Sequence, residues 1–562
     1  MVTIRCSSVV SGLTDGVYSV SEADCLGKPT AREPGETELS EAVHHECGVA
    51  ALYWLGKPAA KAGPASRLVS DANVTALMPS MLLDLQNRGQ LAAGLSSYRG
   101  GRVQLLDTFK DVGTVGETFG MSDPDKHRAI LARYAGCAAI GHTRYATCGR
   151  DDARHAQPFE RHHGRLWKWF SFAFNGQLAN YVELRDRLLA RRHYHFTLNT
   201  DTEIIMHALA YRLRGDRPKP LREVMASLGR SFDGAYNLVF LDALGRMFVA
   251  RDPLGFRPTS WSVQGRLFGA ASESAALSNM GFTDIRTLEP GEMAIVEDGR
   301  LRIERFAACR RRAHCFFEWV YFAGVASTLD GSSVYMARAR SGERLAELED
   351  QRMDESCIVV PVPDTAKAAA DAYAFRMGVP SVEGLIRNRY IGRTFIQPKT
   401  TRGQSAHSKY TPLEAVLGGR RVFLVDDSIV RSTTMRELAA QVRRRGGAKE
   451  VHVRVACPPI VAPCFYGIDM TTLGELFAPA FMPRRYDGTP SRQCLKRMAK
   501  ALGVSSLRYL SVSDLGPCLQ VDGEDLCTGC VTGRHPTKCG RWLMARARRA
   551  ATAGGKASRT YE

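Results

Sequence analysis

Apolar residues between positions 47 and 295 occur in short runs separated by polar, glycine-containing segments. Four runs have the length and composition of buried strands, namely residues 47–55, 138–142, 170–174 and 236–241. One longer segment, residues 76–86, has apolar positions at helical spacing. We therefore expect residues 47–295 to form β-sheets packed by a few helices, an α+β domain.

A different pattern begins near residue 315, where strands and helices alternate. The run Cys357–Pro363 precedes an alanine-rich helix at residues 366–377, and the run Arg421–Asp427 precedes a helix that extends to Arg445. A third strand is expected at residues 451–455. Repeated strand–helix units favour a parallel sheet covered by helices, so we expect an α/β domain here. The chain beyond about residue 480 is expected to be irregular and to end in a basic tail.

These changes divide the chain into four predicted parts: a leader at 1–46, domains at 47–295 and 296–480, and a C-terminal extension at 481–562. The leader lacks the basic start and continuous apolar stretch of a secretory signal, and it is too acidic for a transit peptide. No uninterrupted run of 18 apolar residues occurs, so we expect no membrane-spanning helix and a cytoplasmic protein.

Charge is distributed unevenly over the 562 residues. The leader holds three basic and eight acidic residues and contributes −5 to the net charge of +18, which leaves +23 on the remainder. A basic body can serve a nucleic acid or a phosphate-rich small substrate, or it can reflect an arginine-rich genome. Since no nucleic-acid-binding motif accompanies the charge, we expect no nucleic-acid partner.

The fifteen cysteines mostly stand singly in apolar runs, which suits reduced thiols in a cytosol. The exception is the close pair Cys527 and Cys530. This spacing is typical of half a metal site, although a reduced pair or a redox pair has the same spacing.

The segment Val422–Thr434 carries the clearest candidate chemistry. A strand delivers Asp426 and Asp427 at its carboxyl end, where open α/β sheets bind ligands. The following loop enters a helix, whose N–H groups and the hydroxyls of nearby residues can surround a phosphate. The segment resembles the phosphoribosyl pyrophosphate (PRPP) motif of type I phosphoribosyltransferases. The resemblance implies PRPP contacts from Asp426, Asp427, Val430, Arg431, Ser432, Thr433 and Thr434.

Two further segments complete the predicted PRPP site. The turn Val362–Thr365 follows a second strand; taken alone it is best explained as a capped helix start, but beside the PRPP loop it resembles the family's pyrophosphate- and metal-side turn. Carboxylate and hydroxyl oxygens suit Mg²⁺, and we expect Mg²⁺ on Thr365, Asp426 and Asp427. The basic segment that contains Arg389 and Arg393 resembles a flap over pyrophosphate; a solvated surface loop is the alternative.

Four motifs in the first domain match one template. They are Leu85-Gln-Asn-Arg-Gly-Gln, Ile140-Gly-His-Thr-Arg-Tyr, Phe174-Asn-Gly-Gln and Thr200-Asp-Thr-Glu, and they follow Cys47 in this order. The set resembles class II glutamine amidotransferases, which are N-terminal-nucleophile hydrolases with a four-layer αββα fold. With the PRPP motif downstream, the chain resembles the glutamine PRPP amidotransferases, also called amidophosphoribosyltransferases.

The resemblance implies a role for each matching residue. Cys47 is the nucleophile, and its own α-amine is the base, which requires removal of residues 1–46 as a propeptide. The side chain of Asn175 and the N–H of Gly176 form the oxyanion hole. Arg144, Asp201 and Arg88 are expected to bind glutamine, the first two through its α-carboxylate and α-ammonium.

Some members of this family carry a propeptide together with a [4Fe–4S] cluster. Their ligand motifs are similar to Cys315-Phe-Phe-Glu-Trp-Val-Tyr-Phe, Pro463-Cys464-Phe-Tyr-Gly-Ile-Asp and Cys527-Thr-Gly-Cys530. The implied ligands are Cys315, Cys464, Cys527 and Cys530. Zinc is the competing occupant of four thiolates.

The predicted activity is the transfer of ammonia from glutamine to C1 of PRPP, which gives 5-phosphoribosylamine, glutamate and pyrophosphate. The family places this reaction first in de novo purine synthesis and implies purine nucleotide effectors and a homo-oligomer, a dimer or tetramer. Two alternatives remain: a paralogue that aminates PRPP in specialised metabolism, and a non-enzymatic iron–sulfur regulator that senses PRPP. Ser432 and Gly324-Val-Ala-Ser depart from the family pattern, which usually has Gly or Ala and Arg-Pro-Asp-Ser there.

Overall fold

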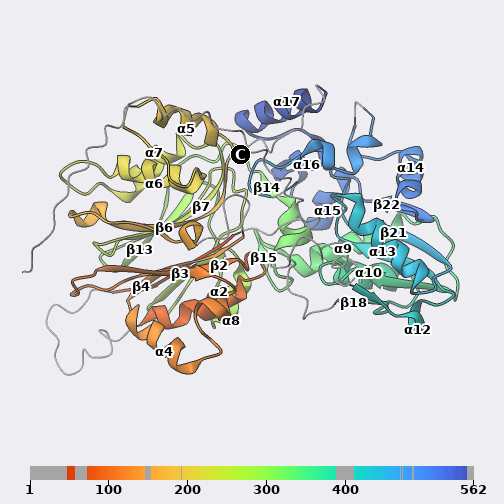
Figure 1. Cartoon of the computed structure of the whole chain (residues 1–562), viewed down its shortest axis with the longest axis horizontal. Coiled ribbons are helices and arrows are strands. Elements are labelled where there is room, and N and C mark those ends of the chain that lie inside the picture. The colour runs from red at the N-terminus through yellow and green to blue at the C-terminus, as the bar shows by residue number, and fades with distance from the viewer. Residues whose placement is uncertain are drawn as a thin grey trace, which may run out of the picture. The chain divides into compact units, whose positions relative to one another are not determined.

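The computed structural model describes residues 47–56, 73–145, 153–191, 193–387, 410–468, 470, 472–483 and 486–552. The leader, the predicted flap residues Arg389 and Arg393 and the last ten residues lie outside these ranges. In the described residues, two antiparallel sheets are followed by a parallel sheet and by C-terminal helices (Figure 1).

The first sheet has seven strands in the order β11-β9-β10-β1-β4-β2-β3. Its centre consists of β1 (Gly48–Trp54), β4 (Ala138–Arg144) and β10 (Leu267–Ala271), which pair antiparallel. The outer strands are β2 (Ala92–Tyr98), β3 (Leu106–Val112), β9 (Ser260–Gln264) and β11 (Arg286–Thr287). β1 is buried over nearly its whole length, as expected for a continuous apolar run between two pairing partners.

The second sheet has six strands in the order β13-β12-β8-β7-β6-β5. They are β5 (Phe159–Arg161), β6 (Phe170–Leu178), β7 (Gly234–Asp242), β8 (Met247–Arg251), β12 (Glu292–Glu297) and β13 (Arg300–Arg305). Residues from both sheets, such as Val49, Ile140 and Val239, share one apolar core between the sheets. The sheets therefore pack face to face.

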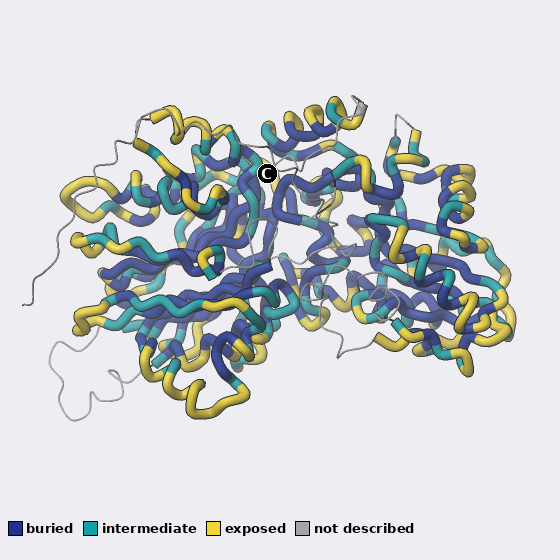
Figure 2. The backbone as a smooth tube through the Cα atoms, in the orientation of Figure 1, coloured by how far each residue is buried: buried dark blue, intermediate teal, exposed yellow. Residues whose placement is uncertain are grey.

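Helices cover the outer face of each sheet. α2 (Met78–Asp84) and α8 (Ser274–Asn279) share an apolar core with the first sheet. α5 (Tyr181–Leu189), α6 (Asp201–Arg212) and α7 (Leu221–Gly229) share another with the second. The predicted αββα layers are thus confirmed, and the buried strands with exposed outer helices are visible in Figure 2.

The second domain has a four-stranded parallel sheet in the order β17-β20-β21-β22. Its strands are β17 (Cys357–Pro361), β20 (Arg421–Asp426), β21 (Glu450–Val455) and β22 (Ser506–Tyr509). The covering helices include α9 (Val334–Glu347), α10 (Lys367–Met377), α13 (Ser432–Arg444) and α14 (Arg492–Leu502). The predicted parallel sheet is therefore confirmed.

Two sheets continue past the predicted domain limits, because β13 lies beyond residue 295 and β22 beyond residue 480. The expectation of irregular structure after about residue 480 is wrong. α14 buries Cys494, Met498 and Leu502 on one face, begins at a Ser491 cap and ends at Gly503 in the left-handed region. The few apolar positions of this helix stand among polar and basic residues, so the local pattern does not predict it.

The C-terminal part adds β23 (Leu526–Cys527), α15 (Leu515–Leu519), α16 (Gly529–Thr532) and α17 (Lys538–Thr552). β23 pairs in parallel with β14 (His314–Cys315), which lies between the two domains in the sequence. Within the described residues, no helix combines the length and apolar character needed to cross a bilayer.

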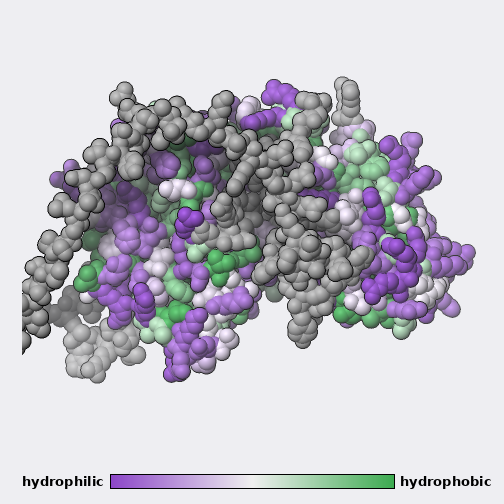
Figure 3. All heavy atoms as spheres, in the orientation of Figure 1, coloured by the Kyte–Doolittle hydropathy of each residue, from purple (hydrophilic) through white to green (hydrophobic). Residues whose placement is uncertain are grey.

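Part of the excess positive charge lies on the helices of the second domain. α14 contains Arg492, Lys496, Arg497 and Lys500 and no acidic residue, and all four side chains are exposed. In Figure 3, hydrophilic residues gather at the right-hand end of the face shown, where Figure 1 places α13 and α14. The charge is therefore carried on solvated helix surfaces.

Candidate functional site

Cys47 lies immediately before β1, between two strands of the first sheet. Gly48 pairs with Thr143 in β4, so the same register places Cys47 opposite Arg144. The thiol donates to the carbonyl oxygen of Tyr145 over 3.7 Å, and Cys47 is partly exposed. A partly exposed thiol at a strand end can meet a substrate, in contrast to the buried structural cysteines.

Asn175 and Gly176 lie in β6, which contacts β1. The Asn175 side chain is 1% exposed, and its Nδ2 donates to the Ser272 hydroxyl over 3.4 Å. Ser272 also accepts from the backbone N–H of Val49 over 3.0 Å, which brings Asn175 close to the start of β1. Gly176 has φ +146°, and a Cβ there would lie 2.0 Å from the Ala235 carbonyl oxygen, so only glycine fits.

Arg144 and Asp201 lie near these residues. Arg144 ends β4 and is buried, and a Cβ on Gly89 would lie 2.5 Å from its backbone, which explains the glycine of the segment Leu85–Gln90. Asp201 begins α6 and accepts from the N–H of Leu178, at the end of β6, over 3.3 Å. Burial raises the pKa of Asp201 to about 6. The structure thus brings the residues that are predicted to bind glutamine together around the ends of β1, β4 and β6.

Arg88 has a different environment from the predicted glutamine contact. Its side chain is fully buried, and its guanidinium is 2.6 Å from a carboxylate oxygen of Glu273 and 2.6 Å from one of Glu318. Each carboxylate would be a buried charge without this partner, so the guanidinium is engaged inside the protein. The side chain still passes beside the nucleophile's neighbour, because a Cβ on Gly48 would lie 3.6 Å from its Cδ.

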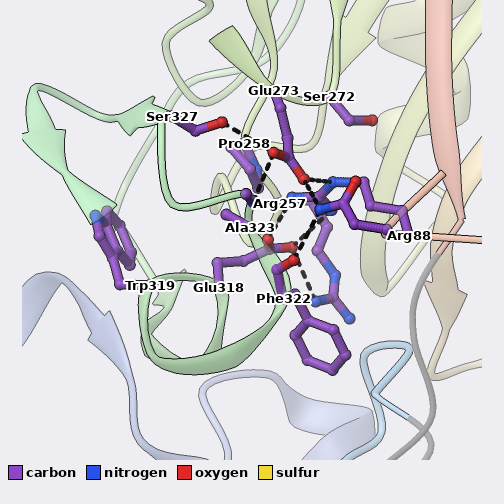
Figure 4. A network of polar contacts seen from close by, with 12 residues as sticks. Arg88, Arg257, Pro258, Ser272, Glu273, Glu318, Trp319, Phe322, Ala323 and Ser327 are labelled. Carbon is purple, nitrogen blue, oxygen red and sulfur yellow. Dashed lines mark hydrogen bonds and ion pairs between the residues drawn. The ribbon is translucent and has the colours of Figure 1, made fainter. Parts of the chain in front are cut away.

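The network around Arg88, drawn in Figure 4, joins the two domains. Glu318 also pairs with Arg257 at 3.3 Å, and Arg257 donates to the carbonyl oxygen of Tyr466 over 2.7 Å. Glu273 accepts from the N–H of Gly324 over 2.8 Å and from the Ser327 hydroxyl over 2.9 Å. We call Arg88, Arg257, Glu273 and Glu318 the buried ion network; its two positive and two negative charges balance.

The second predicted site lies at the carboxyl ends of β17 and β20. Because these strands are parallel neighbours, Thr365 and Asp427 meet, and the Thr365 hydroxyl donates to the Asp427 carboxylate. The Ser428 hydroxyl donates to the other oxygen of Asp427 over 2.7 Å, while the N–H of Asp427 donates to Asp426 over 2.9 Å. The oxygen atoms predicted to hold Mg²⁺ are therefore adjacent.

The loop after Asp427 is fixed by apolar anchors. Ile429 and Val430 are buried in two different cores, and the Val430 carbonyl accepts from the N–H of Phe477 over 2.9 Å. Arg431 is the N-cap residue of α13, and its guanidinium is 3.4 Å from Glu475. The helix then begins with Ser432, Thr433 and Thr434, the last two exposed. A fixed loop that leads into an exposed helix N-terminus is a typical phosphate site.

Of the four cysteines predicted to bind a cluster, Cys464, Cys527 and Cys530 belong to one apolar core, and the partly buried Cys315 packs against it. Cys315 and Cys527 are directly paired across β14 and β23. Cys530 accepts through its carbonyl oxygen from the N–H groups of Val461 and Ala462, over 2.8 and 3.0 Å, close to Cys464. Among the residues that the structure describes, no three or more His, Cys, Asp or Glu side chains converge closely enough to hold a single metal ion.

Residues of the site that sequence reasoning missed are Ser272, Glu273, Arg257 and Glu318. Ser272, Glu273 and Arg257 stand outside the motifs, whereas Glu318 stands in the motif that begins at Cys315, where the resemblance assigns it no role. Their partners are far away in the chain: Ser272 lies 223 positions from Val49, and Glu318 lies 230 from Arg88. Only the pairing of distant strands makes them part of the site.

Comparison with known proteins defines the class of the first domain. Residues 111–289 match the family model described as a glutamine amidotransferase domain. This match agrees with the αββα layers and the arrangement around Cys47. The first domain is a glutamine amidotransferase domain.

Full-length relatives define the family. An amidophosphoribosyltransferase of Methanothermobacter thermautotrophicus is 36% identical over 90% of this chain and 96% of its own length, and that of Bacillus subtilis is 35% identical over 81% and 90%. A solved structure described as glutamine PRPP amidotransferase from B. subtilis complexed with ADP and GMP has a TM-score of 0.73 and 32% identity, covering 88% of this chain and 98% of that one. Another, described as the allosteric regulatory enzyme of purine biosynthesis, has a TM-score of 0.74 and 33% identity, covering 88% and 97%.

The chain belongs to the amidophosphoribosyltransferase family, enzymes of the first step of purine biosynthesis.

The buried ion network gives a prediction for stability. Replacement Arg88→Met keeps most of the apolar stem and removes the charge, which leaves two buried carboxylates without this partner. We expect the free energy of unfolding to fall by ~3–5 kcal/mol, measured as a lower urea midpoint. The control is Arg128→Met, whose pair with Asp125 is exposed on both sides and should leave the midpoint almost unchanged. An Arg88→Met midpoint equal to that of the wild type would contradict this account.

Proposed function

We propose that Cys47 hydrolyses the side-chain amide of glutamine and that the released ammonia displaces pyrophosphate from C1 of PRPP in the second domain. The observation that carries this proposal is the place of Cys47 immediately before β1 and opposite Arg144, where Val49 of the same strand is joined to Asn175 through Ser272. The products are glutamate, 5-phosphoribosylamine and pyrophosphate. We infer the predicted order of parts, with residues 1–46 as a propeptide, but with the first domain extended through β13 and the second domain including β22.

The proposed glutamine site uses complementary charges. Arg144 binds the α-carboxylate, and Asp201 binds the α-ammonium. The Cys47 thiolate attacks the amide carbon, and the α-amine of Cys47 carries the proton to the leaving ammonia, which leaves a thioester; such an amine has a pKa of roughly 8. Water, deprotonated by the same amine, then breaks the thioester, releases glutamate and returns the thiol. Asn175 Nδ2 and the Gly176 N–H stabilise the oxyanion. Arg88 supports this site from within the buried ion network.

In the proposed PRPP site, the loop Val430–Thr434 and the start of α13 hold the 5-phosphate. Asp426 and Asp427 bind ribose hydroxyls, and together with Thr365 they form the oxygen set that fits Mg²⁺, which when bound neutralises charge on pyrophosphate. Arg389 and Arg393 are proposed to close over pyrophosphate; they lie outside the described residues. Closure would keep water from the reacting carbon.

We also propose that Cys315, Cys464, Cys527 and Cys530 hold a structural [4Fe–4S] cluster. The donor set fits, because Cys464, Cys527 and Cys530 lie in one apolar core against which Cys315 packs, and burial together with the neighbouring thiols of Cys464, Cys315 and Cys527 raises the pKa of the Cys530 thiol. Thiolates around a cluster stand further apart than those around one zinc ion, where each bond is about 2.3 Å. The four thiols therefore allow either occupant, and the family resemblance favours the cluster.

The description of one solved relative supports a proposal about regulation. The solved B. subtilis enzyme is described with ADP and GMP, and we propose purine nucleotides as effectors of this chain too. We further propose a homo-oligomer, a dimer or tetramer, that acts in the cytoplasm.

The N-terminal residue tests the proposed nucleophile. Protein purified without air is expected to begin at Cys47, as read by intact mass. Cys47→Ala should abolish glutamine-dependent formation of phosphoribosylamine, because no thiol remains, while the reaction with added ammonia continues at the second domain. A wild-type chain that uses glutamine while it retains residues 1–46 would refute the α-amine as the base.

Asp201 gives a pH dependence of glutamine binding. The carboxyl must be ionised to hold the α-ammonium, and burial raises its pKa to about 6, so the neutral form accumulates as the pH falls through this value. We expect the KM for glutamine to rise about ten-fold from about pH 7 to about pH 5. In Asp201→Asn the KM should be high and flat over the same interval. A wild-type KM that stays constant there would exclude this role.

Metal content tests the cysteine site. Protein prepared without air should contain iron and sulfide in equal amounts and show the broad visible absorption of an iron–sulfur cluster. Cys530→Ser should lose both, whereas Cys494→Ser, a buried cysteine of α14, should keep them. Stoichiometric zinc in place of iron would show that the four thiols form a zinc site.

A further inference from the structure

Ser272 lies between the strand of the nucleophile, β1, and the strand of the proposed oxyanion donor, β6. It directly follows β10, is fully buried, and belongs to none of the motifs that identify the family. Its hydroxyl oxygen accepts from the Val49 N–H, two residues from the nucleophile, and from Asn175 Nδ2. One oxygen atom therefore fixes the strand of the nucleophile and the side chain of the oxyanion donor at once.

The geometry of an amide group gives this contact a chemical meaning. The Asn175 side chain has an NH₂ group with two N–H donors and a carbonyl oxygen with none, and it stabilises an oxyanion only if NH₂ faces the substrate. A backbone N–H is always a donor, so the Val49 contact is made to a lone pair of the Ser272 oxygen, and a second lone pair remains for Asn175. We propose that Ser272 is a positioning residue for glutamine hydrolysis: by accepting one N–H of Asn175 it directs the other N–H to the oxyanion.

Ser272 is itself held by its neighbour in the chain. Glu273 binds Arg88 at 2.6 Å, and it accepts from Asn87 Nδ2 over 2.8 Å and from the N–H of Gly324 over 2.8 Å. Figure 4 shows Ser272 beside this network, with Glu273 directed toward Arg88. Several charge-assisted bonds on the adjacent residue leave the backbone at Ser272 little freedom, so the hydroxyl keeps its place relative to Asn175.

This inference rests on the proposed roles of Cys47 and Asn175. The test compares Ser272→Ala, Asn175→Ala, the double variant and Cys47→Ala; the first three are prepared with Cys47 as the N-terminal residue, verified by mass. Ser272→Ala should lower kcat for glutamine hydrolysis by roughly 10- to 100-fold, less than the complete loss of an oxyanion donor costs. The KM for glutamine should stay within about two-fold, because Arg144 and Asp201 are untouched.

A merely structural role would give other results. If Ser272 acts through Asn175, the double variant is no slower than Asn175→Ala alone, whereas independent defects multiply. The matched control is Ser96→Ala, which removes another buried hydroxyl of the first domain, one bonded to Ser171 over 2.6 Å, and should leave kcat unchanged. Ammonia-dependent activity of each preparation reports that the second domain is folded.

The outcomes separate the two proposals. If Cys47→Ala or Asn175→Ala still uses glutamine at the wild-type rate, the proposed glutamine chemistry fails. If both lose glutamine use while Ser272→Ala keeps a wild-type kcat, the assignment of Ser272 alone is overturned. Multiplicative effects in the double variant, or a raised KM with an unchanged kcat, also overturn it.

Discussion

The buried ion network is the interaction on which the rest of the structure depends. Removing charges from water is costly, so Arg88, Arg257, Glu273 and Glu318 are tolerable inside the protein only when all four are paired. They come from segments of both domains and meet where the strand of Cys47 begins. The requirement to satisfy these charges therefore fixes the start of the second domain against the glutamine site. Ser272 and Asn175 take their positions from this arrangement.

Much of the first domain could be predicted from local pattern, because its buried strands are continuous apolar runs and its substrate-binding residues stand in short motifs. The motif residues gather at the ends of β1, β4 and β6 as the resemblance implies. Arg88 shows the limit of such reasoning. Its motif marks it as part of the site, but whether a guanidinium meets a substrate or two carboxylates depends on partners 185 and 230 positions away.

In the second domain too, the sheet topology could be predicted from the sequence, whereas some short elements could not. Alternating strands and helices predict a parallel sheet, and parallel neighbours must bring Thr365 and Asp427 to one edge, as the structure has them. The fourth strand and α14 could not be seen as easily. β22 has only four residues, and α14 is so rich in arginine and lysine that its four-residue apolar spacing is hidden. Short elements at a sheet edge owe their stability to tertiary packing rather than to their own sequence.

The pairing of β14 with β23 has a consequence for how the protein folds during its synthesis. A ribosome releases the chain from its N-terminus, and domains fold as they emerge. The sheets of the first domain can form once β13 has left the ribosome. Glu273 then still lacks its hydrogen bonds from Gly324 and Ser327. Cys315 can pair with Cys527 only when that later residue has been synthesised. A prematurely ended chain would keep its catalytic domain but expose unsatisfied charges and an open apolar core. The contact between β14 and β23 is therefore made only after the chain has been synthesised to Cys527.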